Sequence, residues 1–241
     1  MGTMATIDLI AQPGTAEVLA GIESTFEDIE NVFSLYRPDS ELSRIAAGRL
    51  PLTESSAQLR GVYEQSLSWR NATNGAFTPH RPDGVVDLDG IVKAAAIERA
   101  GGLLDASGSS DWCINVGGDL LCRGIQSDGR PWTLGIVDPE DRGALLCSIV
   151  LQGERRAVAT SGSTERGDHI WRDGSRTNPS FRQVTVIADD IITADVLATA
   201  IVSGGRTALD DATERWPIDV LTVGSDGSMR ATAGFRAALA A

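Results

Sequence analysis

The sequence is poor in the residues that mark several common classes of protein. Only 5% of its 241 residues are aromatic, two are histidine, and the formal net charge is −12 with no cluster of lysines and arginines. A protein with this charge and no basic patch is repelled by nucleic acid and by anionic membrane surfaces. We therefore expect no nucleic-acid partner.

Cysteine is also scarce. Cys113, Cys122 and Cys147 are odd in number and widely spaced, so they fit neither a disulfide framework nor a CxxC metal pair, and we interpret them as small core residues.

Long apolar runs are missing as well. No stretch approaches the roughly 18 to 20 apolar residues of a membrane span, so no span is expected. The N-terminus, "MGTMATIDLIAQPG", lacks the basic start and apolar run of a signal peptide. We expect a cytoplasmic location for the chain as given, with an exported form trimmed of its leader as the alternative.

What the chain does have is enough apolar sequence, 42% of residues, to bury a sizeable core. Helical spacing predicts amphipathic helices over residues 15–35 and 53–75, the second capped by Thr53 and stopped at Asn74-Gly75, and a short helix capped by Ser40. Residues 163–183 are predicted to be a loop. Alternating and apolar segments predict strands at 4–10, 112–125, 132–139, 145–153, 156–162, 183–189 and 218–227. Helices and strands mix without strict alternation, which favours an α+β fold with a mixed or antiparallel sheet and packed helices, in one domain over 1–241.

One stretch, "VVDLDGIVKAAAIERAGG" (residues 85–102), keeps a single lysine among small apolar residues. Its pattern predicts a helix with Asp89 as N-cap, Lys93 in the first turn and Gly101-Gly102 as the end. A lysine at a helix start makes an anion site, for which phosphate is the commonest ligand. The alternative, which local features alone favour, is that Lys93 reaches out of a buried helix to pair with Asp87 or Asp89.

A second stretch, "ITADVLATAIVSGG" (residues 192–205), is predicted to be a helix, which places Asp195 and Thr199 four residues apart and so on one helical face. A carboxylate and a hydroxyl together suit a hard cation such as Mg2+. The alternative is a polar stripe facing solvent. The sequence contains no G-x-S-x-G motif, which argues against a serine hydrolase with Ser161 or Ser163 as nucleophile. The segment "INVGGDL" contains neither a dinucleotide-binding fingerprint nor a P-loop, which argues against those two nucleotide-binding folds.

The order of the motifs is more specific than any one of them. The chain contains, in sequence, "MGT", "FSLYRPDSELSRI", "NGAF", "VDLDGIVKAAAIERA", "INVGGDL", "WTLGIVDP", "VATSGSTERGDHI" and "VTVIADDIITADVLATAIVSGG". From about residue 1 to 225 this series resembles the ApbE family, the FAD:protein FMN transferases. The resemblance implies an ApbE-like fold, FAD as substrate and a Mg2+ or Mn2+ ion. It also implies transfer of FMN to a Thr or Ser hydroxyl of an acceptor flavoprotein, with release of AMP.

The resemblance also implies roles for individual residues. His169 matches the catalytic position, and Gly90, Asp195 and Thr199 match the metal ligands, with Gly90 contributing its backbone carbonyl. The positions that match flavin-contacting ones are Met1, Tyr36, Ala76, Phe77, Thr78, Asp87, Lys93 and Ile170.

The sequence departs from the family pattern at Thr78, where the family usually has Asp, and after Ile170, where "WRDGSRTNPSF" replaces "DPRTG". Two other functions therefore stay open: a metal-dependent FAD pyrophosphatase giving FMN and AMP, and an FAD-binding protein without turnover.

Overall fold

The computed structural model describes residues 4–10, 14–162 and 180–240. Its helices are α1 (Thr15–Phe33), α2 (Glu41–Ala46), the 3-10 turn η1 (Leu52–Glu54), α3 (Ala57–Ala72), α4 (Asp89–Ala106), α5 (Ile191–Arg215) and α6 (Ala233–Ala237). Its strands are β1 (Ala5–Leu9), β2 (Trp112–Val116), β3 (Asp119–Arg123), β4 (Thr133–Val137), β5 (Leu145–Val150), β6 (Ala157–Gly162), β7 (Phe181–Ala188), β8 (Asp219–Gly224) and β9 (Met229–Ala231). The α+β prediction is confirmed.

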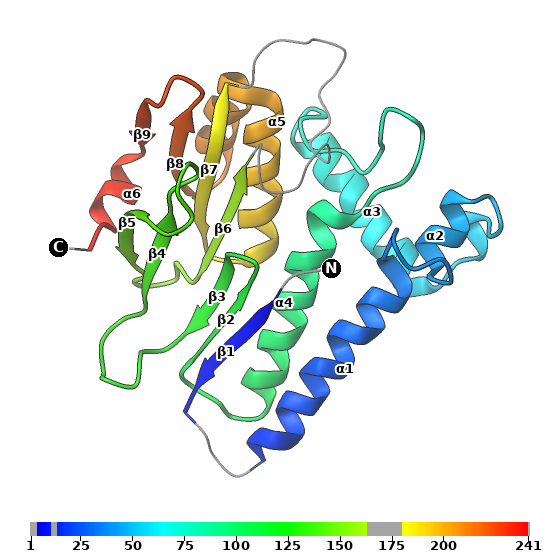
Figure 1. The fold of residues 1–241 in the computed structure, drawn as a ribbon, viewed down its shortest axis with the longest axis horizontal. Helices are drawn as coiled ribbons and strands as arrows, with labels where there is room; N and C mark the ends of the chain where they lie inside the picture. The colour runs from blue at the N-terminus through cyan, green and yellow to red at the C-terminus, as the bar shows by residue number, and fades with distance from the viewer. Residues whose placement is uncertain (1–3, 11–13, 163–179, 241) are drawn as a thin grey trace.

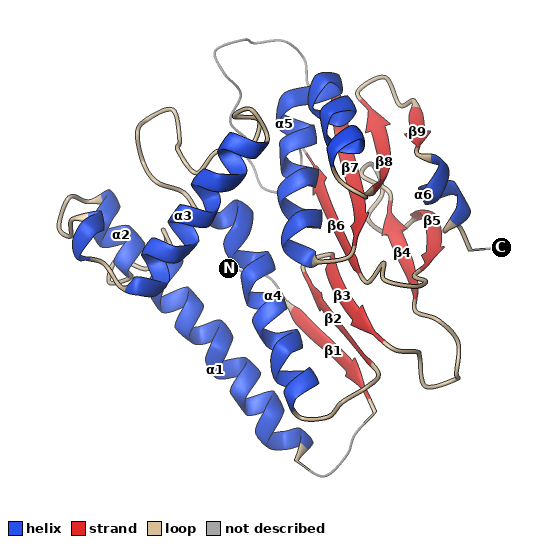
Figure 2. Ribbon diagram, turned by 180° about the vertical axis from the view of Figure 1, so that it is seen from behind, coloured by secondary structure: helices blue, strands red, loops and turns tan. Residues whose placement is uncertain are grey.

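The strands form one main antiparallel sheet in the order β1-β2-β3-β6-β7-β8-β9, and β4 and β5 pair as a separate hairpin. Helices α4 and α5 lie side by side against one face of the main sheet, and α1 packs on α4 (Figure 1). The β4–β5 hairpin and α6 lie on the opposite face, as Figure 2 shows from behind. The sheet therefore separates two apolar cores, a large one under the helices and a smaller one under the hairpin.

Helix α4 starts and ends differently from the prediction. Leu88, not Asp89, is the N-cap residue, and Asp87 Oδ1 accepts a hydrogen bond from the Asp89 backbone N–H at 3.0 Å. The helix also runs past Gly101 to Ala106, because Gly101 is a packing residue rather than a stop. A Cβ on Gly101 would lie 2.8 Å from the Trp112 ring, so only glycine lets α4 approach the sheet this closely.

The caps of the preceding helices were predicted with mixed success. Ser40 caps α2, accepting a hydrogen bond from Ser43 N–H at 3.0 Å, as expected. Thr53 was wrongly predicted to cap the next helix: it lies in η1, and Ser56 caps α3 through a 3.2 Å bond from Leu59 N–H. Thr53 and Ser56 both precede the apolar repeat of the helix. The 3-10 turn that begins after Pro51 contains Thr53, so the N-cap position falls three residues later, at Ser56.

Helix α5 is longer than the predicted 192–205 segment. Gly205 leaves helical geometry (φ 67°, ψ −145°), at the glycine pair where the end was expected, but helical structure resumes and continues to Arg215. Strand β7 in turn begins at Phe181, inside the predicted 163–183 loop. Within the described part of the chain, no helix is long and apolar enough to cross a membrane.

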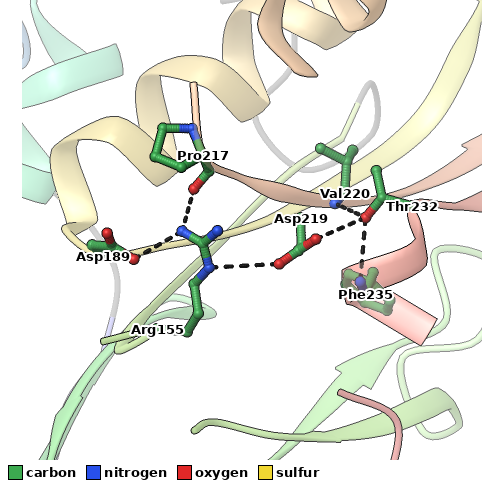
Figure 3. Close-up of polar contacts among 7 residues, drawn as sticks. All are labelled: Arg155, Asp189, Pro217, Asp219, Val220, Thr232 and Phe235. Carbon is green, nitrogen blue, oxygen red and sulfur yellow. Dashed lines mark hydrogen bonds and ion pairs between the residues drawn. The ribbon is translucent and has the colours of Figure 1, made fainter. Parts of the chain in front are cut away.

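An arginine joins the ends of several elements near the start of β6. Arg155 contacts the Asp189 carboxylate at 2.8 Å, the Pro217 carbonyl, and Asp219 at 3.5 Å (Figure 3). Asp219 in turn accepts a hydrogen bond from the hydroxyl of Thr232, the N-cap residue of α6. These contacts fix the start of β6 against the β7–α5 and α5–β8 connections, and β6 is one of the strands that carry site residues.

Candidate functional site

The centre of the site is a buried group of charged side chains between α4, α5 and the sheet. Lys93 projects from α4 and Asp195 from α5, and their exposed fractions are 5% and 1%. Lys93 Nζ forms an ion pair with Asp119 Oδ2 and lies 4.0 Å from Asp195 Oδ1. Lys93 is the fifth residue of α4, just past the first turn in which it was predicted, and its partner is neither Asp87 nor Asp89.

Asp119 is the residue of this group that the sequence did not assign. It is completely buried, and its Oδ1 accepts a hydrogen bond from the Thr160 backbone N–H at 3.2 Å. The turn that places it is Gly117-Gly118, with φ values of 61° and 94°, which a two-residue hairpin turn requires. The sequence signal was present in "INVGGDL", where an acid directly follows the glycine turn, but nothing local showed that Lys93 would face it.

One hydroxyl pair joins the polar cluster from strand β6: Ser161 Oγ and Thr199 Oγ1 lie 3.1 Å apart and share a hydrogen bond. Thr160 Oγ1 and Thr185 Oγ1 share another at 2.9 Å, but side chains alternate along a strand, so this second pair lies on the hairpin face of the sheet, away from Lys93. Thr199 therefore faces strand β6, and Asp195 one turn earlier is buried. The interpretation of this helix face as a solvent-exposed polar stripe is wrong.

The donor set fits a hard divalent cation. In their charged forms Lys93, Asp119 and Asp195 carry a net charge of −1 in an interior that disfavours uncompensated charge, so a cation is favoured there. Within the described residues, no three His, Cys, Asp or Glu side chains are grouped as a metal cage. Mg2+ needs no such cage, since it is usually held by one or two carboxylates together with water and substrate phosphates. Asp195 and Thr199 meet that requirement.

The predicted flavin-contacting segment 76–78 runs beside the start of α4 and the kink of α5. Phe77 is buried in the core, and a Cβ on Gly90 would lie 3.0 Å from its ring. Likewise, a Cβ on Gly204 of α5 would lie 3.0 Å from the Ala76 Cβ. Gly90, one turn before Lys93, is thus covered on one side by Phe77, which leaves no room there for a larger residue.

Two further predicted residues border this segment. The Thr78 hydroxyl accepts a hydrogen bond from the His80 backbone N–H at 3.2 Å, and the Asp87 backbone N–H donates to the Pro79 carbonyl at 2.8 Å. Asp87 is half-buried and lies directly before α4. The loop 76–88 is thereby folded back on itself at the N-terminal end of α4.

Within the described part of the chain, the remaining predicted residues are not placed in this group. Tyr36 lies between α1 and α2, with 74% of its surface exposed. Met1, His169 and Ile170 lie outside the described residues. Their predicted roles stay predictions.

His80 is a histidine of this loop to which no role was predicted. Its Nε2 lies 3.0 Å from the Tyr63 hydroxyl of α3, and the two rings meet edge to face at 5.8 Å. Burial lowers the pKa of His80, and the nearby positive charge of Arg70 lowers it further. The neutral imidazole is therefore the favoured form in the folded protein.

Comparisons with known proteins agree with the fold and with the motifs. The FAD:protein FMN transferase of Vibrio cholerae is 24% identical over 269 residues, covering 86% of this chain and 80% of that protein. The relative from Klebsiella pneumoniae, which carries the same name, is 31% identical over 125 residues, but covers only 47% of this chain and 35% of its own length.

Solved structures show the same fold. The flavin transferase ApbE of Vibrio cholerae superposes with a TM-score of 0.77 at 24% identity, covering 99% of this chain and 96% of that one. The ApbE protein of Thermotoga maritima superposes with a TM-score of 0.82 at 22% identity, covering 100% and 97%. The model of the ApbE family matches residues 1–81 and 79–222, well over half of the sequence. The chain therefore belongs to the ApbE family.

Proposed function

We propose that this protein is an FAD:protein FMN transferase that moves FMN from FAD onto a Thr or Ser hydroxyl of an acceptor flavoprotein and releases AMP. Family membership and the names of the relatives support the reaction. The observation that carries the proposal is the buried group of Lys93, Asp119 and Asp195 beside the Thr199 hydroxyl. It combines one cation for an anionic substrate with oxygen ligands for a metal.

Lys93 is the residue that would meet the pyrophosphate of FAD. An ammonium group in a low-dielectric layer attracts a phosphate oxygen more strongly than it would in water. Its ion pair with Asp119 holds the side chain in place before substrate binds, so that less ordering is needed when the phosphate arrives. Asp119 is thus a positioning residue for Lys93.

Asp195 and Thr199 would hold the metal ion, with the Gly90 carbonyl as the ligand that family resemblance adds. When bound, Mg2+ would offset negative charge on the phosphates and so make phosphorus easier to attack. The Ser161 hydroxyl, hydrogen-bonded to Thr199, orients the Thr199 oxygen.

His169 is proposed to accept the proton that the acceptor hydroxyl loses as it attacks phosphorus. A neutral imidazole has a pKa close to neutral pH and suits this role. His169→Ala is expected to keep FAD binding and lose transfer. Unchanged transfer by this variant would remove His169 from the mechanism.

The test is to incubate the protein with FAD and MgCl2, with and without a protein fragment carrying a flavinylated-threonine motif of the family. AMP is followed by chromatography, and covalent flavin on the acceptor by in-gel fluorescence. AMP and fluorescent acceptor should appear together and should both be lost with EDTA and in Asp195→Ala. Replacing MgCl2 by MnCl2 measures which ion is preferred.

Two outcomes would overturn the proposal. AMP formed at the same rate without acceptor, with no labelled protein, would identify an FAD pyrophosphatase. FAD bound tightly, with no AMP in either arm, would identify a binding protein. Asp210→Ala is the matched control for Asp195→Ala, because Asp210 is an exposed aspartate on the same helix, α5, outside the buried group.

A further inference from the structure

Two of the three cysteines, which are nine residues apart in the sequence, face one another across the β2–β3 hairpin. The register pairs Cys113 directly with Cys122. The Cys122 backbone N–H points away from β2 and donates to the Arg156 carbonyl at 2.8 Å. Cys113 and Cys122 are therefore a non-hydrogen-bonded antiparallel pair, in which the Cα atoms are about 4.5 Å apart and the side chains are closest.

The sulfur atoms are already within reach of a bond. Cys113 Sγ and Cys122 Sγ lie 2.8 Å apart, and their residues are 7% and 2% exposed in the smaller core under the β4–β5 hairpin. A disulfide has an S–S length of about 2.05 Å and tolerates Cα separations of roughly 4.4 to 6.8 Å. The sulfurs need to approach by only about 0.8 Å, which side-chain rotation supplies.

We propose that Cys113 and Cys122 form a cross-strand disulfide, while Cys147 stays a free thiol. The two thiols lose two protons and two electrons as the S–S bond forms, and a low-molecular-weight disulfide such as oxidised glutathione accepts them and becomes two thiols. In the first step Cys113, the more exposed of the two, exchanges with glutathione disulfide and releases one glutathione thiol. Cys122 then attacks the Cys113 sulfur and releases the second.

The bond would act on the hairpin that carries Asp119. Cys122 lies three residues after Asp119 on β3, with its side chain on the opposite face of the sheet. Closing the short loop between the cysteines lowers the entropy of the unfolded chain and so stabilises the hairpin. The inference rests on strand register and sulfur geometry alone, so it stands or falls independently of the transferase reaction.

The route to the disulfide follows from the burial of the pair. The hydrogen bond with Cys113 and burial raise the pKa of the Cys122 thiol, so little thiolate is present in the folded hairpin. Because the thiolate is the attacking species, the bond should form fastest while the hairpin is open during folding. Refolding is therefore the decisive condition, and oxidation of the folded protein is expected to be slower.

The test uses the whole protein, reduced and unfolded, then refolded with an excess of oxidised glutathione or with dithiothreitol. The products are alkylated with iodoacetamide without reduction and digested with trypsin. Cys113 and Cys122 share the tryptic peptide 100–123, whereas Cys147 lies in 143–155. After oxidation, peptide 100–123 should be unalkylated and lighter than the dithiol by two hydrogen atoms, and Cys147 should be alkylated. Dithiothreitol should restore three alkylated cysteines.

Thermal unfolding provides a second readout. The oxidised protein should melt roughly 5 °C above the reduced one, which is the order expected for a disulfide in a chain of this size. The shift should persist in Cys147→Ala and vanish in Cys113→Ala. Alkylation of all three cysteines after oxidative refolding would overturn the proposal. So would a stable glutathione adduct on peptide 100–123 or a disulfide that includes Cys147.

Discussion

Lys93 and Asp119 are joined as a buried ion pair although they come from elements that are separate in the sequence, helix α4 and the β2–β3 hairpin. The pair connects the helix layer to the sheet at the point where α5 adds a second carboxylate. A buried ion pair contributes little net stability, since desolvation offsets attraction, but breaking one is costly. We therefore attribute the Lys93–Asp119 ion pair to positioning: the Asp119 carboxylate holds the Lys93 ammonium at a fixed place in the site.

The first prediction concerns Asp119→Asn, which keeps the shape and the acceptor for Thr160 N–H but removes the charge. Lys93 would lose its closest partner while staying buried, so the free energy of unfolding should fall by about 3 kcal/mol. FAD affinity should fall as well, because the ammonium is no longer held in place. Urea unfolding and fluorescence titration with FAD measure the two effects.

Asp128→Asn is the control. Like Asp119, Asp128 pairs with a cationic side chain (Arg130) and accepts a hydrogen bond from a backbone N–H, but both side chains of that pair are more than half exposed. It should change stability by no more than about 0.5 kcal/mol. Equal losses in the two variants would show that Asp119 has no special role.

The sequence predicted the elements of this site better than the contacts between them. Asp195 and Thr199 share a helix face because of their spacing alone, and that face is indeed turned inward. The partner of Lys93 could not be predicted, because it depends on how a hairpin packs against a helix. Resemblance to a family supplied the list of residues, but Asp119 was not on it.

The second prediction is a matched pair at Thr199. Thr199→Val removes the hydroxyl at nearly constant shape and breaks the contact with Ser161, whereas Thr199→Ser keeps the oxygen. If Thr199 binds the metal, the Mg2+ concentration for half-maximal AMP release should rise at least roughly tenfold in the valine variant and recover in the serine variant. Thr213→Val on the same helix, where the hydroxyl bonds the Leu209 and Asp210 carbonyls of the helix itself, should leave the Mg2+ dependence unchanged. An unshifted Mg2+ curve in Thr199→Val would exclude Thr199 as a ligand.

The third prediction compares neighbouring glycines in α4. Gly101→Ala would place a Cβ 2.8 Å from the Trp112 ring and 3.0 Å from Leu121, so it should destabilise the protein by about 1–3 kcal/mol. Gly102→Ala meets nothing within 4 Å and should stabilise the helix by roughly 0.5–1 kcal/mol. Denaturant midpoints of the two variants give the answer, and the same sign in both would contradict the packing role of Gly101.

Gly101 also shows why the end of α4 was predicted wrongly. A glycine pair at the end of an apolar segment is a common helix stop, and the sequence carries no sign that Trp112 will lie against it. In α5 the predicted helix end, Gly205, does have a positive φ that interrupts the helix, but helical structure continues beyond it to Arg215. Glycine marks a special backbone position in both helices, but tertiary packing decides whether that position is a break or a close approach.

The fourth prediction concerns the protonation of His80. Burial and Arg70 lower its pKa, so in the folded protein it should titrate below the ordinary value of about 6.5. As the pH falls through 6.5 the unfolded chain binds the proton before the folded one does, so stability should decrease until the pH passes the folded pKa. His169→Ala leaves His80 as the only imidazole, and NMR of its ring protons then gives the folded midpoint directly. In His80→Gln this part of the pH dependence of stability should disappear. A midpoint at or above 6.5 would mean that Tyr63 and the surrounding loop do not shield His80 as the structure indicates.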